Sequence, residues 1–233
     1  MTAENEPTAG VWPPPPNGLP DQEDWKSKPF RPVTRIGQVA IVFLVIGAIA
    51  YFLELFCDVV VIYASSLHSA AALQTKASDS IAVLSTIESV CLLVAGIPFL
   101  IWLYRACANL TALGVPNPRF SPGWAVGSYF VPFLGIYCPF LSMREVWNGS
   151  MTAGNHQSTL VVGLWWWLWI AANALGCIIG VDSVIHAHNA DQDQYVSFVY
   201  NALFLASSLL AVRVVATVSQ SQVRKHAEMS ARS

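Results

Sequence analysis

The sequence predicts an all-α membrane protein with four transmembrane helices and one further segment, broken by proline and glycine, that is re-entrant or interfacial. Apolar residues make up 55% of the 233 residues and charged residues only 11%, less than half of the roughly 25% that is usual in soluble globular domains. The charges also gather toward the two ends of the chain, so long apolar runs alternate with short polar gaps. The lipid bilayer is therefore the first partner that we expect.

Four apolar runs are long enough to cross the hydrocarbon core of a membrane, which takes about 20 helical residues. They cover residues 36–63, 81–104, 160–181 and 195–218. Together they predict one polytopic helical domain over residues 36–218. Residues 1–35 are polar and rich in proline, so we expect a disordered cytoplasmic arm there. Residues 219–233 are expected to form a cytoplasmic tail.

A fifth apolar segment, residues 124–141, is short and contains two glycines and two prolines. Proline removes a backbone donor and interrupts the helical hydrogen-bond ladder. Short cytoplasmic loops collect Lys and Arg, and these residues test whether the segment crosses. A crossing segment leaves six basic residues on each side, whereas a segment that returns to its own side leaves eleven inside and only Lys76 outside. The distribution favours four spans in the cell membrane, with both termini cytoplasmic.

Three short strings of residues surround and include this segment. Between Trp102 and Trp147 the chain reads WLYRACANL, then SPGWAVGSYFVPF, then PFLSMREVW. These strings resemble a family of bacterial membrane proteins named domain of unknown function 4328 (DUF4328). The resemblance rests on Arg105, Asn109, Leu110, Pro122, Gly123, Trp124, Ala125, Val126, Gly127, Phe130, Pro132, Pro139, Met143, Glu145 and Trp147. It is expected to cover residues 36–218, and it implies an integral membrane protein of a bacterial envelope without implying an activity.

The same residues also have a physical interpretation. Ser121 can cap a helix that has Pro122 at its first position. Trp124 and Trp147 are expected at the headgroup level of the membrane, where indole rings collect. Two interpretations of the whole segment stay open: a half-membrane loop that lines a cavity, or an interfacial segment that braces the bundle.

Three acidic residues fall inside apolar runs, where ionisable side chains usually have a function. Glu54 and Asp58 are four residues apart and so share one helix face. The second run crosses the membrane in the opposite direction, and Glu88 lies near its start. We therefore expect all three carboxylates at a similar depth in the outer leaflet. Carboxylates crowded in a low dielectric cannot all stay ionised. They form either a proton or cation site or a protonated, hydrogen-bonded pair with a structural role.

Two functions follow from these alternatives. In the first, the chain has a structural or regulatory role in the envelope, and its proline-rich arm engages a cytoplasmic protein. In the second, it is a small transporter or channel-like protein whose carboxylates bind protons or cations.

Other kinds of chemistry have little support in the sequence. No catalytic motif is present, so we expect neither an enzyme nor a cofactor. The net charge of −2 gives no reason to expect nucleic acid as a partner. The loop at residues 182–194 contains two histidines but matches no established metal motif. All five cysteines are expected to be packing residues without a metal: Cys57, Cys91, Cys107, Cys138 and Cys177.

The third apolar run carries two packing patterns. A ridge of small residues, which lets another helix approach closely, is formed by Ala172, Gly176 and Gly180. We expect the approaching helix to belong to the same chain, with a homo-oligomer as the alternative, and we expect Asn173 to hydrogen-bond across this contact. An inner-leaflet belt of indole rings is expected from Trp165, Trp166, Trp167 and Trp169.

Overall fold

The computed structural model describes residues 29–66, 71–152, 158–185 and 190–232. Within these residues all regular structure is helical, which confirms the predicted all-α class. In chain order the elements are α1 (Thr34–Ser66), α2 (Ala71–Ala112), α3 (Pro122–Gly127), the 3₁₀ turn η2 (Ser128–Phe130), α4 (Leu134–Ser150), α5 (Leu160–Ile185) and α6 (Ala190–Ser230).

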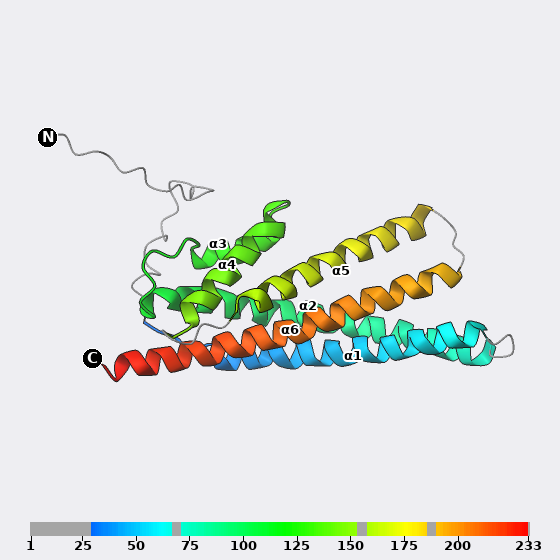
Figure 1. Cartoon of the computed structure of the whole chain (residues 1–233), viewed down its shortest axis with the longest axis horizontal. Helices are drawn as coiled ribbons and strands as arrows, with labels where there is room; N and C mark the ends of the chain where they lie inside the picture. The colour runs from blue at the N-terminus through cyan, green and yellow to red at the C-terminus, as the bar shows by residue number, and fades with distance from the viewer. Residues whose placement is uncertain (1–28, 67–70, 153–157, 186–189, 233) are drawn as a thin grey trace.

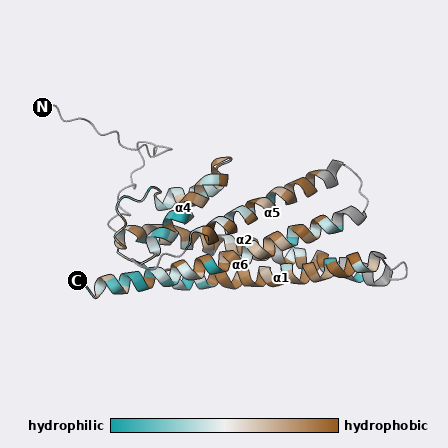
Figure 2. Ribbon diagram, in the orientation of Figure 1, coloured by the Kyte–Doolittle hydropathy of each residue, from teal (hydrophilic) through white to brown (hydrophobic). Residues whose placement is uncertain are grey.

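Four of these helices are long and apolar enough to cross a membrane, as predicted. Their spanning stretches are Thr34–Ala64, Asp79–Ala112, Leu160–Ile179 and Gln194–Ser230. Hydrophobic side chains cover their outer faces, and Phe52, Phe56 and Leu93 are 60%, 64% and 77% exposed. An apolar surface of this extent is unfavourable in water and marks contact with lipid. The chain is therefore a multi-pass membrane protein, and Figure 2 shows hydrophobic residues along the spans and hydrophilic ones at the C-terminal end of α6.

The contacts between the long helices place them in an open arc, in the order α2, α1, α6, α5. Helix α1 packs along both α2 and α6, and α6 packs along α5. The two ends of the arc, α2 and α5, approach each other where Phe99 meets Trp165, with ring centroids 6.0 Å apart. Over the described residues they do not pack along their lengths. The bundle is therefore not closed on itself.

The segment between α2 and α5 forms a helical hairpin instead of a fifth span. Elements α3 and η2 lead away from one end of the bundle and α4 leads back to it, the same end at which α1 begins and α6 ends (Figure 1). At the tip, Phe133 has a φ of 64°, and a Cβ on Gly135 would stand 3.2 Å from the carbonyl oxygen of Ser128. Pro139 does not end the helix and lies inside α4. The predicted segment therefore enters and leaves by the same end.

The larger apolar core lies at this end, where the hairpin packs against α2, α5 and α6. Trp102, Trp147 and Trp166 are buried there. Trp147 lies on the face of α4 that turns toward the bundle, and its position at the headgroup level stays a prediction. Trp124 is half-buried and packs at the edge of the same core.

The two terminal regions meet beside the hairpin. Most of the predicted arm, residues 1–28, lies outside the described residues. The ring of Phe30 stacks on His226 with centroids 4.2 Å apart. The predicted tail continues α6 as far as Ser230, and its first turn is buried at Ser219 and Gln222. The last residues of the arm and the end of α6 are thus held together.

Candidate functional site

Two of the three predicted acidic residues lie side by side inside the bundle. Glu54 and Asp58 on α1 are only 3% and 2% exposed. Asp58 faces α6, where Asn201 Nδ2 donates to its carboxylate at 2.9 Å and Ser197 Oγ donates at 3.4 Å. These two donors are four residues apart, so one turn of α6 supplies both. Both donors are uncharged, so they solvate a carboxylate without neutralising it.

Sequence reasoning missed Asn201 as a member of this site. Its side chain is 2% exposed, and its Oδ1 is buried without a hydrogen bond in the described part of the chain. An amide has a donor end and an acceptor end, so it can donate to an ionised carboxylate and accept from a protonated one. The available signal was an amide four residues after Ser197 in an apolar run, but the sequence does not say which face of that run meets α1.

Some predicted residues cannot be placed. Glu88 lies in α2, but its side chain is outside the described residues, so the structure brings together two of the three acidic residues. In the histidine-containing loop, residues 186–189 are likewise outside the described part of the chain.

A cavity of about 650 Å³ lies inside the arc and is lined by residues of α1, α2, η2, α5 and α6, a size usual for ligand pockets. Its aromatic lining comprises Tyr51, Phe99, Tyr129, Phe130, Trp165, Trp166, Trp169, Tyr200 and Phe204. Its α2 wall is open, because Leu93 and Ile97 line it and are 77% and 66% exposed. The cavity therefore opens sideways, between the two ends of the arc.

The cavity extends to the level of the acidic pair. Tyr51 precedes Glu54 by three residues on α1, and Tyr200 precedes Asn201 by one on α6. At the other end, the hydroxyl of Tyr129 is buried and has no hydrogen-bond partner among the described residues. Burial raises the pKa of Tyr129 above its ordinary range, so the cavity meets a neutral phenol there.

The predicted tryptophan belt was wrong for three of its four members. Trp165 and Trp166 are 6% and 1% exposed, and Trp169 is half-buried and lines the same cavity, whereas Trp167 is 48% exposed. Trp166 Nε1 donates to the carbonyl of Ile136 in the hairpin at 2.8 Å. This face of α5 turns toward α6 and the hairpin, so its rings form a cavity wall.

The ridge of small residues on α5 packs within the chain. Ala172 is buried in one cluster with Tyr51 and Phe204, and a Cβ on Gly176 would lie 2.9 Å from the ring of Tyr200. Asn173 does not bond across the contact as expected, because one residue along the helix turns it off the contacting face. It is exposed, and its Nδ2 donates to the Trp169 carbonyl of its own helix at 2.8 Å. The burial and contacts of Gly180 lie outside what the structure describes.

A second polar cluster lies at the terminal end of the bundle around Asn109, which is 3% exposed. Its Nδ2 donates to the carbonyl of Arg31 at 2.8 Å and to Gln222 Oε1 at 2.9 Å, and its Oδ1 accepts from Arg31 N at 3.0 Å. Gln222 Nε2 in turn donates to Ser150 Oγ at 3.1 Å and to the carbonyl of Ala106 at 2.9 Å. One amide pair thus joins the arm, α2, α4 and α6.

The remaining family residues shape the hairpin. Ser121 caps α3 as predicted, because its Oγ accepts from Trp124 N at 3.3 Å and Pro122 holds the first helical position. Gly123 and Gly127 belong to α3, and Pro132 lies in the turn before α4.

Glu145 on α4 binds the loop that leads into α3. Its carboxylate accepts from Arg119 N at 2.6 Å and from Phe120 N at 3.3 Å. The two hydrogen bonds hold this loop on α4, and backbone donors bind a carboxylate more strongly than a neutral acceptor.

A family model described as domain of unknown function (DUF4328) matches residues 64–220. The chain belongs to this family, as the three strings predicted. The match begins at the end of α1 and not at residue 36, so Glu54 and Asp58 lie outside it and Asn201 lies inside it. No curated protein and no solved structure matches the chain.

Proposed function

We propose that this DUF4328 protein is a small membrane transporter that exchanges protons for a lipophilic cation. In this proposal Glu54 and Asp58 bind the proton and the aromatic cavity binds the transported molecule. The observation that carries it is Asp58, which is 2% exposed within an apolar bundle and is held by two donors of α6.

Two features of the acidic pair support a reversible proton site. Two carboxyl groups one helical turn apart repel each other when both are ionised, so one proton between them relieves the repulsion. Asn201 can serve both charge states through the two ends of its amide, and the buried Oδ1 is an acceptor open to a protonated carboxyl.

The cavity favours a lipophilic cation for two reasons. The faces of Trp, Tyr and Phe rings attract cations, most strongly where water is excluded, and nine aromatic residues line the wall. The mouth lies between α2 and α5, so an apolar molecule dissolved in the bilayer can enter sideways.

The orientation in the cell membrane is part of the proposal. Helix α1 begins and α6 ends at the hairpin end of the bundle (Figure 1). In the four-span arrangement, eleven of the twelve basic residues belong to the sequence of the arm, to the stretch from Arg105 to Arg144 or to the C-terminal part of α6 and the residues after it. The positive-inside rule then places this end, with both termini, in the cytoplasm.

The test is proton release driven by a probe cation in proteoliposomes. The full chain is reconstituted with a pH-sensitive dye inside, and tetraphenylphosphonium is added outside. Wild type should show proton efflux, and Asp58→Asn should lower it at least tenfold, because an asparagine oxygen can still accept from Asn201 but the side chain cannot carry a proton.

The matched control is Glu228→Gln, which removes an acid on the exposed last turns of α6, where it faces Arg224 at 3.8 Å. This variant should retain wild-type efflux. Asp58→Asn at wild-type rate, or wild type without any efflux, would refute the proposal, provided that circular dichroism and gel filtration show folded protein.

A regulatory role in the envelope is a second proposal, supported by the contacts of the arm. Arg31 contacts α2 and Phe30 contacts α6. A cytoplasmic protein bound to the arm could therefore act on these two helices through those contacts. Deletion of residues 1–28 leaves these contacts intact. Cross-linked partner recovery that is the same with and without residues 1–28 would count against this role.

A further inference from the structure

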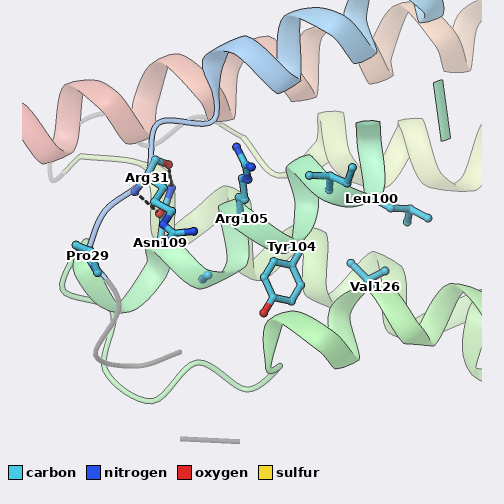
Figure 3. A pocket seen from close by; sticks show the side chains of 9 residues that line it. Pro29, Arg31, Leu100, Tyr104, Arg105, Asn109 and Val126 are labelled. Atoms are coloured by element: carbon cyan, nitrogen blue, oxygen red, sulfur yellow. Dashed lines mark hydrogen bonds between the residues drawn. The ribbon is translucent and has the colours of Figure 1, made fainter. Parts of the chain in front are cut away.

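A recess of about 490 Å³ lies at the terminal end of the bundle, between the arm, α2 and α3. Its polar residues are Arg31, Arg105 and Asn109, and Leu100 and Val126 are apolar residues of the lining (Figure 3). Ile101 adds to the apolar part of the lining. It is separate from the aromatic cavity in position and chemistry, and the transport proposal does not use it.

Asn109 places the two arginines in one recess. It lies one helical turn after Arg105 on α2, so both face the same side. Its hydrogen bonds to the backbone N–H and carbonyl of Arg31 hold the arm against this side (Figure 3). The buried amide is thus a positioning group for Arg31.

The guanidinium groups are available to a ligand. Both arginines are exposed, and neither makes an ion pair within the described ranges. Among the residues that the structure describes, none of those lining the recess is acidic. A guanidinium presents a planar fork of N–H donors that matches the oxygens of a phosphate.

The surroundings of the arginines add an apolar requirement. Arg105 follows the apolar stretch of α2 that contains Leu100 and Ile101. A ligand in the recess would therefore contact the arginine and the apolar side chains of α2 at the same time. Basic pockets beside transmembrane helices hold anionic lipid headgroups. A soluble phosphate would satisfy the arginines but would leave the apolar side uncovered.

We propose that this recess binds an anionic phospholipid, with its phosphate group on Arg31 and Arg105 and an acyl chain along Leu100 and Ile101. The ligand class is a phosphodiester with lipid tails, held at the same end of the bundle as the hairpin.

The experiment measures lipid retention by native mass spectrometry. The full chain is released from nanodiscs that contain phosphatidylcholine and phosphatidylglycerol, and bound phosphatidylglycerol is counted. Wild type should retain it. Arg31→Gln and Arg105→Gln should each weaken retention about fivefold, the factor that corresponds to about 1 kcal/mol for each basic residue near a membrane surface. Arg105→Lys should show a smaller loss, because it keeps the charge but not the fork.

Arg144→Gln is the matched control, since Arg144 is an exposed arginine of α4 that does not line the recess. It should retain lipid as wild type does. The proposal is overturned if both recess variants retain lipid normally, or if Arg144→Gln loses as much. It is also overturned if inorganic phosphate displaces the lipid at equal concentration, because the ligand would then be a soluble anion. Circular dichroism of each variant confirms the fold before the comparison.

Discussion

Replacing Asn109 by alanine should destabilise the whole terminal end of the bundle. The substitution deletes three hydrogen bonds, two to the backbone of Arg31 and one to Gln222. It also leaves Gln222 Oε1, on a side chain that is 0% exposed, without the donor that Asn109 supplies. The loss therefore contains both missing bonds and a buried acceptor that nothing satisfies.

The size of the effect follows from these parts. A typical hydrogen bond contributes about 1 kcal/mol net, and an unsatisfied buried acceptor costs about 1–3 kcal/mol. The Arg31 groups can recover bonds with water because Arg31 is exposed, so they contribute less. The free energy of unfolding should fall by about 3 kcal/mol, which lowers the melting temperature by roughly 6–12 °C for a chain of this length.

The measurement is thermal unfolding in detergent, followed by circular dichroism and by tryptophan fluorescence. Asn148→Ala is the control, because Asn148 is an exposed asparagine on α4 whose loss should change stability by less than about 0.5 kcal/mol. If Asn109→Ala melts within about 1 °C of wild type, the amide cluster does not hold the arm, α2, α4 and α6 together.

Three further substitutions and one control substitution test other contacts. Gly176→Ala should lower the free energy of unfolding by about 1–3 kcal/mol, because its Cβ would stand 2.9 Å from the facing tyrosine ring. Gly123→Ala is the control: a Cβ there has nothing within 4 Å, so overpacking should not lower its melting temperature. Tyr129→Phe should leave stability unchanged or raise it by up to about 1 kcal/mol, because it removes a buried hydroxyl without a partner in the described residues; a clear loss of stability would show that the hydroxyl is bonded. Glu145→Gln should loosen the loop that its carboxylate holds, and faster tryptic cleavage after Arg119 would measure this, while an unchanged rate would speak against the contact.

The four spans could be predicted from hydropathy because hydrocarbon accepts only backbone that satisfies its own hydrogen bonds. The hairpin required a second argument, the distribution of basic residues, since residues 124–141 are apolar enough to resemble a span. The cap at Ser121 was also predictable, because a serine before a proline at a helix start depends on local sequence only. These features are local or follow from the solvent.

Which face of each span packs inside the bundle was not predictable in the same way. In a soluble protein, polar residues mark the outer face of a helix, but in lipid both the inner and the outer faces are apolar. Trp165 and Trp167 are therefore equivalent in sequence, although one is 6% and the other 48% exposed. The partners of Asn201 and Gln222 belong to other helices and are distant in the chain: Asp58 is 143 residues from Asn201, and Ala106 is 116 residues from Gln222.

The position of α5 links the acidic pair to the cavity in the proposed exchange. Helix α5 meets α6 through Gly176, on which the ring of Tyr200 packs, and Tyr200 adjoins the amide that binds Asp58. A proton on Asp58 favours the acceptor end of that amide, whereas an ionised Asp58 favours the donor end. If α6 rotates with this change, the ring of Tyr200 would move against Gly176. Gly176 has no side chain that could move aside, so the backbone of α5 would have to shift. Because α5 forms one side of the cavity mouth, the shift would alter the width of that mouth, and this would couple the proton to the transported molecule in the proposed exchange.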